Sequence, residues 1–401
     1  MDFAAQMAVI KRGAIDIFPE GELEKKVKKS IETGTPLRVK LGVDPTATDL
    51  HLGHIVPLLK LKAFQDLGHQ AVLIIGDYTA MVGDPSGRNK SRPQLTHEEV
   101  MKNCETYTEQ AFKILDPEKT EVVFNGSWFS KLSFTDVIKL LSQMTLARML
   151  EREDFAHRYK NGFPISLHEL VYPLMQGYDS AMIKADIELG GTDQKFNILV
   201  GRDIQREMDQ SQQVGLCVPI LIGLDGREKM SKSLGNYIAV DEEPAEMYGK
   251  VMSIPDELMT MYFELLTQVP EEEIASINKG LEEGSLHPRE VKRRLAREIV
   301  ARFHSADAAQ GAEETFDLVF IKGEVPEDIP VMELKAEPIW IVKLLVEAGF
   351  ASSNGEARRL VQGGGVRIDG EPVKDVDLDW PPTDGAILQV GKRKFMRIVL
   401  S

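Results

Sequence analysis

Two histidines stand out because their spacing suits the handling of phosphate groups. His51 and His54 are three residues apart, so both side chains fall on one face at the start of a helix. Gly53 lets a flat ring approach the backbone, and the free N–H groups at the start of a helix suit phosphate. We expect Asp49 or Thr48 to cap this helix. These features indicate a nucleotide site, although the same pair arises by chance and is also half of a metal site, for which no third ligand is evident nearby.

Two lysines form a second motif, KMSKS, at residues 229–233. Lys229 and Lys232 lie three apart in a loop flanked by glycine and serine. Lysine is a flexible point charge, so such a loop can close on a triphosphate and follow a phosphate as it leaves. The alternative is a solvated charged turn. The two motifs support each other because each follows a predicted strand of a parallel sheet, and ligands bind where such strands end.

The elements that must position these residues alternate between strand and helix. We expect strands over residues 37–46, 69–80 and 121–126, with helices over 51–68 and 96–115 between them. The strand at 69–80 is apolar without alternation, as in a strand buried on both faces. This order predicts an α/β fold with a doubly wound parallel sheet of the Rossmann-like kind.

The next part of the chain is expected to be more helical. Residues 130–187 are predicted to be mostly helical, and LGGTDQ at 189–194 is predicted to be a short loop before a helix at 195–208. VPILIGL at 218–224 is predicted to be a further buried strand. Residues 225–236 are the polar loop that carries the lysine motif.

Changes in composition suggest the domain organisation. A nucleotide-binding domain is predicted over residues 1–240, with a helical region near 130–187. An α-helical domain follows at 241–325. A linker rich in proline and acidic residues then spans 326–338 and leads to a small α+β domain at 339–401.

Composition excludes several classes of protein. The chain has 401 residues, 43% hydrophobic and 28% charged, as in a globular protein of two or three domains. Its two cysteines, Cys104 and Cys217, exclude a disulfide scaffold and a cysteine-based zinc site. The net charge of −15 argues against non-specific nucleic-acid binding by the whole surface, but not against a local basic patch. Since neither an apolar membrane span nor a signal peptide is found, we expect a cytoplasmic protein with no membrane contact.

The motifs taken together resemble one family. HLGH followed by KMSKS is similar to the signature pair of class I aminoacyl-tRNA synthetases, and VDPTATDLHLGH, GDPSG, YPLMQGYD and GGTDQ in this order resemble the bacterial tyrosyl-tRNA synthetases. GEARRLVQGGGVRIDGEPV resembles the small RNA-binding module that this family carries last and shares with a ribosomal protein. The resemblance covers about residues 35–401 and implies an anticodon-binding helical domain. It implies that L-tyrosine is joined to ATP, that pyrophosphate is released, and that the tyrosyl group moves to the 3′ end of its tRNA.

The resemblance implies roles for the residues that handle phosphate. His51 and His54 would hold ATP phosphates in the transition state, Thr46 would sit beside the γ-phosphate, and Lys229 and Lys232 would neutralise the departing pyrophosphate. The other positions implied at the nucleotide are Asp44, Gly53, Arg88 and Arg92, together with Gly191 and Asp193 at the ribose. ATP is thus expected as a substrate with Mg²⁺ carried by its phosphates, and no protein-bound metal or organic cofactor is expected.

For tyrosine the resemblance implies a pocket lined by Lys40, Asp84, Tyr172, Gln176, Asp179 and Gln194. A carboxylate, a phenol and two amides would surround the ammonium group, and Asp179 would accept a hydrogen bond from the phenolic hydroxyl. Lys40 is a departure, because many members have a tyrosine there. We expect Lys40 either to pair with Asp179 or to donate to the phenol oxygen.

The resemblance implies that the tRNA for tyrosine is a partner. The candidate contacts are Lys292, Arg293 and Arg297 in the helical domain, and Arg358 and Arg359 before the GGG turn of the last domain. The basic run in the helical domain is equally consistent with a solvated helix face in which Glu290 pairs with Arg294.

The resemblance implies that residues 1–240 are the catalytic domain and that the helical region near 130–187 is its connecting insertion. This insertion carries an apolar stripe that has two interpretations. Leu141, Met144, Leu146 and Met149 are either intramolecular core or a contact surface, and family analogy favours a homodimer. Two other functions stay open: a synthetase for a related aromatic amino acid, and a catalytically inactive, synthetase-like RNA-binding protein.

Overall fold

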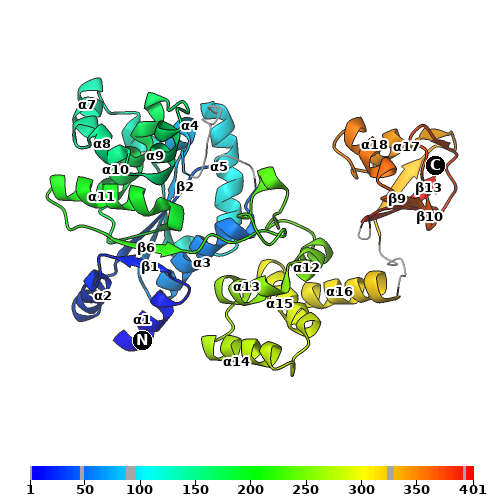
Figure 1. Cartoon of the computed structure of the whole chain (residues 1–401), viewed down its shortest axis with the longest axis horizontal. Coiled ribbons are helices and arrows are strands. Elements are labelled where there is room, and N and C mark those ends of the chain that lie inside the picture. The colour runs from blue at the N-terminus through cyan, green and yellow to red at the C-terminus, as the bar shows by residue number, and fades with distance from the viewer. Residues whose placement is uncertain (1, 46–48, 87–95, 323–328, 392–393) are drawn as a thin grey trace. The chain divides into compact units, whose positions relative to one another are not determined.

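The computed structural model describes residues 2–45, 49–86, 96–322, 329–391 and 394–401 (Figure 1). The α-helices described are α1 (Phe3–Lys11), α2 (Glu22–Thr33), α3 (Leu52–Asp66), α4 (Thr79–Val82), α5 (His97–Ala111), α6 (Gly126–Phe129), α7 (Phe134–Ser142), α8 (Leu146–Met149), α9 (Glu153–Lys160), α10 (Tyr172–Met182), α11 (Lys195–Glu207), α12 (Pro244–Met252), α13 (Met259–Leu266), α14 (Glu271–Glu282), α15 (Pro288–Phe303), α16 (Ala306–Asp317), α17 (Ile341–Glu347) and α18 (Asn354–Gln362).

The strands described are β1 (Asp16–Phe18), β2 (Arg38–Val43), β3 (Gln70–Ile75), β4 (Thr120–Phe124), β5 (Ile187–Gly191), β6 (Val214–Val218), β7 (Val331–Leu334), β8 (Ile339–Trp340), β9 (Val366–Ile368), β10 (Glu371–Pro372), β11 (Asp379–Trp380), β12 (Ile387–Val390) and β13 (Lys394–Leu400). Short helical turns are η1 (Pro117–Lys119), η2 (Leu167–Val171), η3 (Thr192–Gln194), η4 (Lys232–Leu234), η5 (Asp256–Leu258) and η6 (Leu318–Lys322).

The first part of the chain forms a six-stranded sheet in the order β1-β6-β5-β2-β3-β4. Strands β2 to β6 run parallel, and β1 pairs antiparallel with β6 at the edge. The chain builds outward from β2 through β3 to β4, then returns to β5 on the other side of β2. The strand order therefore reverses between β2 and β5, which is where ligands bind in open α/β sheets.

Helices cover both faces of this sheet, so strands inside it are buried on both sides. Helices α10 and α11 lie on one face, and α3 and α5 lie on the other (Figure 1). Every residue of β6, and β3 from Ala71 onward, is buried. The fold class predicted from the sequence, a doubly wound parallel sheet, is confirmed, as are its first three parallel strands and the two helices between them.

Three predictions about local structure in this sheet are wrong. LGGTDQ is not simply a loop, because its first glycines end β5, which pairs with β2 and β6 on its two sides. The buried strand before the lysine motif is Val214–Val218, and it ends where Pro219 removes a backbone N–H. Composition also predicts helix throughout residues 1–36, but this segment contributes β1 as well. Pairing with strands distant in sequence decides these cases, and local composition does not.

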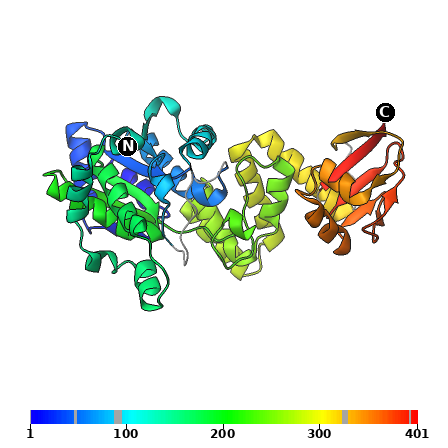
Figure 2. The same ribbon diagram turned by 90° about the horizontal axis from the view of Figure 1, so that it is seen from above.

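The expected linker also differs in the structure. Within residues 326–338, Val331–Leu334 forms β7, which pairs in parallel with β13 at the edge of a second sheet, ordered β10-β9-β12-β13-β7. Helices α17 and α18 pack on this sheet through Leu345, Val361, Leu388 and other buried apolar residues (Figure 2). The C-terminal domain therefore includes at least part of the segment expected to be a linker.

The chain divides into two compact units. The first contains Met1–Glu242 and Ile254–Leu295, and the second contains Glu243–Ser253 and Ala296–Ser401. The helical region expected at 241–325 thus contributes to both. Within the described ranges, no helix is both long enough and apolar enough to cross a membrane.

Candidate active site

Most of the residues predicted from the motifs gather at the carboxyl ends of β2 and β5, where the strand order reverses. Two adjoining cavities lie there, an inner cavity of about 240 Å³ and an outer cavity of about 470 Å³. His54, Pro57, Tyr107 and Gly191 line both cavities. All of the lining residues belong to the first unit.

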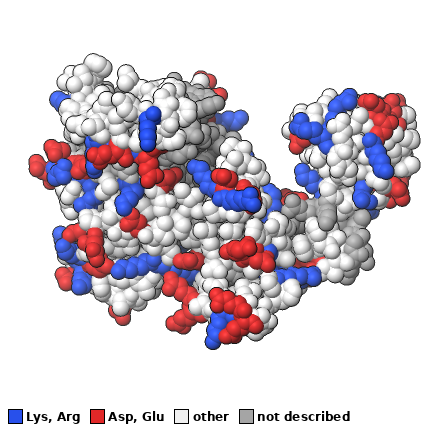
Figure 3. Space-filling view, in the orientation of Figure 1, with Lys and Arg blue, Asp and Glu red and all other residues white. Residues whose placement is uncertain are grey.

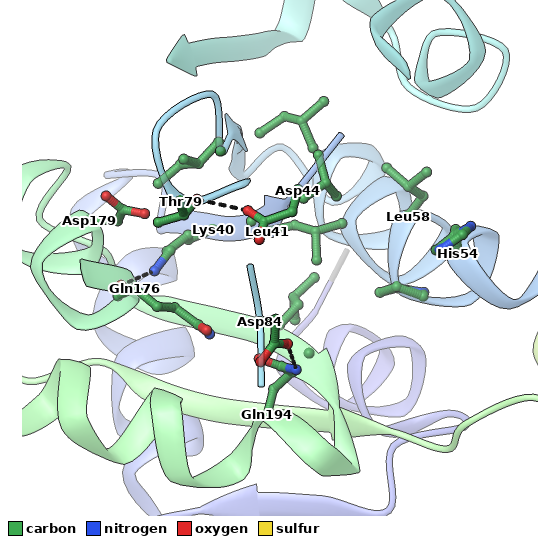
Figure 4. Close-up of a pocket in the computed structure, with 18 of the residues that line it drawn as sticks. Lys40, Leu41, Asp44, His54, Leu58, Thr79, Asp84, Gln176, Asp179 and Gln194 are labelled. Carbon is green, nitrogen blue, oxygen red and sulfur yellow. Dashed lines mark hydrogen bonds between the residues drawn. The ribbon is translucent and has the colours of Figure 1, made fainter. Parts of the chain in front are cut away.

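The inner cavity brings together all six residues predicted for the amino acid, and Asp44 with them. Its polar lining includes Lys40, Asp44, Asp84, Tyr172, Gln176, Asp179 and Gln194 (Figure 4). Helix α10 supplies Tyr172, Gln176 and Asp179, whose spacing places them on one helix face. Because these side chains share one face of the helix, the helical periodicity of this segment determines the geometry of one wall of the inner cavity.

Asp44 follows directly after β2 and is held by two hydroxyl groups. Its Oδ1 accepts a hydrogen bond from Thr79 Oγ1 at 2.7 Å, and its Oδ2 accepts one from the Tyr172 hydroxyl at 2.9 Å. Burial raises the pKa of Tyr172 well above its ordinary value, and the Asp44 carboxylate acts in the same direction. Gly76 is required beside this carboxylate, because a Cβ there would lie 2.1 Å from Asp44 Oδ1.

Asp179 is a buried carboxyl group with one donor on each oxygen. Asn125 Nδ2 donates to its Oδ2 at 3.1 Å, and Trp128 Nε1 donates to its Oδ1 at 2.9 Å. Burial raises the pKa of Asp179 to about 7, against the opposing effect of the Lys40 charge. Its position is therefore fixed from both sides, with acceptor capacity left for a polar group in the cavity.

Lys40 does not pair with Asp179, so that prediction is corrected. Its ammonium group donates to Glu188 Oε1 at 2.8 Å, Ser180 Oγ at 2.7 Å and the Gln176 carbonyl at 2.7 Å. In Figure 4 the ammonium group points toward Gln176 and away from Asp179. Glu188 lies on β5 directly across from Lys40, and no sequence motif pointed to it.

The other end of the inner cavity is organised around Asp84. Its Oδ2 accepts a hydrogen bond from Gln194 Nε2 at 2.9 Å, and its Oδ1 accepts one from the Ser86 N–H at 2.8 Å. The buried guanidinium group of Arg152 lies 3.4 Å from Asp84 and donates to Asn197 at 3.1 Å. Arg152 belongs to the connecting insertion, so the insertion contacts the residues that surround the cavity.

The outer cavity contains the two predicted histidines, whose rings stack at 3.8 Å between centroids. Burial lowers the pKa of His51 to about 4, and the Lys232 ammonium group acts in the same direction. Burial also lowers the pKa of His54 well below its ordinary range. Both rings are therefore neutral near pH 7.

The hydrogen bonds of these rings assign their tautomers. His51 Nδ1 accepts the Gly53 N–H at 3.2 Å, and His54 Nδ1 accepts the His51 N–H at 3.3 Å. The ring protons are accordingly assigned to Nε2. Each histidine then carries an N–H donor without a positive charge.

The expected cap and the expected free backbone donors of this helix are both corrected. The N-cap of α3 is His51 itself, whereas Asp49 lies beside Lys232 at 3.1 Å. Thr48 lies outside the described residues. The first N–H groups are already used, by the Ile238 carbonyl and by acceptors on His51. The donors that this helix offers are imidazole groups rather than backbone N–H groups.

The KMSKS segment forms part of the wall of the outer cavity. Lys229 and Lys232 line it together with His51, Gly53 and Asp193. Asn236 holds the segment in place, because its Oδ1 accepts the Ser231 N–H at 2.8 Å and its Nδ2 donates to the Lys229 carbonyl at 3.1 Å. The two predicted motifs, 175 residues apart from His54 to Lys229, therefore face one cavity.

Gly191 and Asp193 lie where β5 ends. A Cβ on Gly191 would approach Asp193 Oδ1 to 2.7 Å, so this position favours glycine. Burial raises the pKa of Asp193, with Asp84 acting in the same direction and Lys229 opposing it. Three predicted residues, Thr46, Arg88 and Arg92, lie outside the described residues.

The basic run on α15 is used mainly within the protein. Lys292 is buried, and its ammonium group donates to the Ile254 carbonyl at 2.6 Å and to Asp256, so its predicted contact with RNA is corrected. Arg294 pairs with Glu273 on α14 at 2.7 Å, and the expected pairing with Glu290 is wrong. The predicted contacts Arg293 and Arg297 also have carboxylates within reach, Glu290 at 4.0 Å and Glu313 at 2.6 Å respectively.

The two arginines predicted in the last domain are more accessible. Arg359 is exposed on α18. Arg358 is half-exposed, lies over the ring of Trp340, and has Asp377 at 3.5 Å. Figure 3 shows basic and acidic side chains interspersed on the visible face of this domain.

Several side chains that support the inner cavity were not among the residues predicted from the motifs. They are Thr79, Asn125, Trp128, Arg152, Ser180, Glu188, Asn197 and Gln213. Each is buried or half-buried and bonds to a predicted residue or to its partner. A polar residue inside an apolar strand, such as Glu188 in IELGG, is the one signal that the sequence offered.

Two family models together match most of the chain. The model described as "tRNA synthetases class I (W and Y)" matches residues 32–320, and the model described as "Tyrosine--tRNA ligase SYY-like C-terminal domain" matches residues 321–398. A tyrosine–tRNA ligase of Moorella thermoacetica is 56% identical over 99% of this chain and 96% of its own length. One of Geobacter metallireducens is 54% identical over the full length of both chains.

Solved structures share the fold of this chain at much lower identity. A C-terminally truncated mitochondrial tyrosyl-tRNA synthetase of Aspergillus nidulans superposes with a TM-score of 0.64 at 23% identity, over 79% of this chain and 94% of its own. A tyrosyl-tRNA synthetase of Archaeoglobus fulgidus gives 0.63 at 24% identity, over 78% and 99%. These matches confirm the resemblance inferred from the motifs over the full chain. The chain belongs to the tyrosyl-tRNA synthetase family of class I aminoacyl-tRNA synthetases.

Proposed function

We propose that this chain is a tyrosine–tRNA ligase that joins L-tyrosine to ATP, releases pyrophosphate and transfers the tyrosyl group to the 3′ end of its tRNA. The observation that carries the proposal is the pair of adjoining cavities. One is lined by carboxylates and amides, and the other is lined by neutral imidazole donors and lysines. We propose the cytoplasm as its compartment, because ATP and tRNA are held there.

The inner cavity suits tyrosine at both ends of the molecule. Asp84, Tyr172, Gln176 and Gln194 would surround the ammonium group with acceptors. Asp179 would accept the hydrogen bond of the phenolic hydroxyl. Phenylalanine would leave this buried acceptor without a partner, and such sites reject the analogue that lacks the hydroxyl.

The outer cavity suits the triphosphate of ATP. The substrate carboxylate attacks the α-phosphate, so the protein needs to position the reactants and stabilise charge. His51 and His54 would donate Nε2–H groups to phosphate oxygens, while Lys229 and Lys232 follow the departing pyrophosphate.

Other positions complete the proposed nucleotide site. Asp44 would sit between ATP and tyrosine, and Gly53 would leave room for the nucleotide. Thr46, Arg88 and Arg92 would approach the phosphates, and Gly191 and Asp193 would hold the ribose.

Mg²⁺ is proposed to enter with ATP, held by the phosphates and by water. This ion dehydrates reluctantly and is commonly bound through substrate phosphates. Within the part of the chain that the structure describes, no three His, Cys, Asp or Glu side chains are grouped so as to hold a metal ion. The ion would supply neutralisation of phosphate charge, in addition to that from the two lysines.

The proposed activity is tested by amino-acid-dependent exchange of labelled pyrophosphate into ATP, with each of the twenty amino acids in a separate assay. We expect exchange with tyrosine alone, because Asp179 provides an acceptor for its hydroxyl. Exchange with a different aromatic amino acid would favour the related-synthetase alternative. A folded protein with no exchange at all would favour an inactive RNA-binding protein.

His54 provides the sharpest test of the phosphate role. In His54→Asn, the side-chain oxygen can still accept the His51 N–H, but the Nε2 donor is lost. We expect kcat of tyrosine-dependent exchange to fall about 10²-fold in this variant and in His54→Ala, with little change in the tyrosine KM. The control is His157→Ala, at an exposed histidine far along the chain. Unchanged kcat in His54→Asn would contradict the donor role.

The C-terminal domain is proposed to bind tRNA through Arg358 and Arg359, while Arg293 and Arg297 are proposed to contact the anticodon stem. Removing residues 329–401 should spare pyrophosphate exchange, because both cavities lie in the first unit, and should weaken tRNA charging. Loss of exchange on truncation would mean that the domain is structural.

Arg359→Ala should raise the KM for tRNA, and the effect should shrink at high salt because phosphate contacts are screened. Lys343→Ala, at an exposed lysine of the same domain, is the matched control.

A homodimer is proposed through the connecting insertion. The stripe predicted there divides in two: Met144 and Met149 pack in an apolar core shared with α10 and α11, whereas Leu141 and Leu146 are exposed. Exposed Phe134 and Ile138 extend the outer half along α7.

Charge placed on this outer half should separate the two chains. We expect Ile138→Lys to shift the sedimenting species from dimer to monomer, because a buried unpaired ammonium group disfavours association. Leu286→Lys, at an exposed leucine elsewhere, should leave the species unchanged. A monomeric wild-type protein at micromolar concentration would refute the proposed dimer.

A further inference from the structure

A fully buried ion pair lies beneath the inner cavity, at the place where the strand order reverses. Lys40 on β2 and Glu188 on β5 are direct cross-strand neighbours, and their side chains are 0% and 1% exposed. Their charged atoms are 2.8 Å apart. Burying two charges costs free energy that such a pair recovers only when further hydrogen bonds satisfy the remaining atoms.

The ammonium group of Lys40 has no hydrogen left for a substrate. A lysine carries three donors, and these are directed to Glu188, to Ser180 Oγ and to the backbone carbonyl of Gln176. All three distances lie between 2.7 and 2.8 Å. A hydrogen bond from Lys40 to the tyrosine hydroxyl would require one of these bonds to break inside the protein.

Glu188 is saturated in the same way, and one of its bonds reaches the cavity lining. Its Oε2 accepts hydrogen bonds from Ser180 Oγ at 3.0 Å and from Gln213 Nε2, while its Oε1 accepts from Lys40 and from Gln176 Nε2 at 3.1 Å. Asn197 Nδ2 donates to Gln176 Oε1 at 2.9 Å. The Gln176 amide is therefore fixed in one of its two flipped orientations.

We propose that Lys40 and Glu188 act as one positioning unit, which fixes the side chain of Gln176 for tyrosine binding, and that Lys40 does not contact the substrate. The inference rests on the proposed function, since Gln176 is taken there to meet the ammonium group of tyrosine. Both residues would affect the binding of tyrosine through Gln176, and neither would take part in the chemical step.

The arrangement predicts that removing one charge raises the tyrosine KM, whereas removing both charges leaves it close to the wild-type value. Glu188→Gln leaves the Lys40 charge buried without a counter-ion, so the pocket floor must rearrange. Combining it with Lys40→Met removes both charges, and the amide oxygen introduced at position 188 can still accept the Gln176 N–H. Gln213 can then flip its amide and turn its Oε1, which has no hydrogen-bond partner among the described residues, toward the new amide N–H, at the cost of the hydrogen bond from its Nε2 to the Ile198 carbonyl at 3.2 Å. The double variant should therefore restore the orientation of Gln176.

The test measures kcat and KM for tyrosine in pyrophosphate exchange. We expect Glu188→Gln to raise the tyrosine KM about tenfold or more with kcat within about threefold of wild type. The double variant should return the KM to within about threefold of wild type. The matched control is Lys26→Met, which removes the ion pair of Lys26 with Asp186, the residue just before β5, and it should leave the KM unchanged.

The Lys40→Met variant tests for direct contact with the substrate. We expect the ratio of kcat/KM for tyrosine to that for phenylalanine to stay within about threefold of wild type. The ratio is measured at about pH 9, because removing the Lys40 charge raises the pKa of Asp179, which burial already raises to about 7. A tenfold or larger fall in this ratio would overturn the inference and make Lys40 a reader of the hydroxyl.

Several outcomes separate the inference from the proposed function. If the wild-type protein shows no tyrosine-dependent exchange, the proposed function fails and the inference fails with it. If wild type is active but Glu188→Gln lowers kcat and leaves KM unchanged, only the inference fails. If Glu188→Gln does not fold, the double variant decides alone, and a folded double variant with KM raised tenfold would overturn the inference.

Discussion

The pairing of β2 with β5 is the constraint on which the rest of the site depends. These strands are far apart in the sequence, yet Lys40 and Glu188 lie directly opposite each other in the register. Because the chain leaves this junction in both directions, the loops after β2 and β5 diverge and leave a space between them. Asp44 stands at one side of that space and Gly191 at the other, so a shift in register would displace both cavities together.

The two cavities differ in charge although they share a wall. Carboxylates from three elements face the inner cavity, where a cationic ammonium group is proposed to bind. The outer cavity instead combines two lysines with two histidines whose pKa values are lowered by burial. Neutral imidazoles can donate hydrogen bonds without adding charge in the resting enzyme. The cations come from the KMSKS segment, and Asn236 holds the backbone of this segment at Ser231 and Lys229.

The placement of individual charges in this protein says more about RNA binding than its net charge does. A chain of net charge −15 is an unusual partner for RNA. Much of the basic run on α15 is paired with carboxylates, and Lys292 is buried. For the tRNA contact proposed above, the exposed Arg359 on α18 is therefore a better candidate than the basic run on α15.

The sequence by itself determined the class of the sheet, the two phosphate-handling motifs and the face of α10 that carries Tyr172 and Asp179, because each depends on spacing within one segment. It also allowed the family to be recognised. The tertiary structure alone decided which groups meet across segments: the partner of Lys40 is Glu188 and not Asp179, although both are carboxylates. Because β5 ends in two glycines, its local propensity predicted a loop. A strand inside a parallel sheet is stabilised by neighbours on both sides, which local propensity does not describe. The donors of α3 are imidazoles because a distant carbonyl, that of Ile238, already occupies a backbone N–H. In each case the missing information was the identity of a partner brought close by folding.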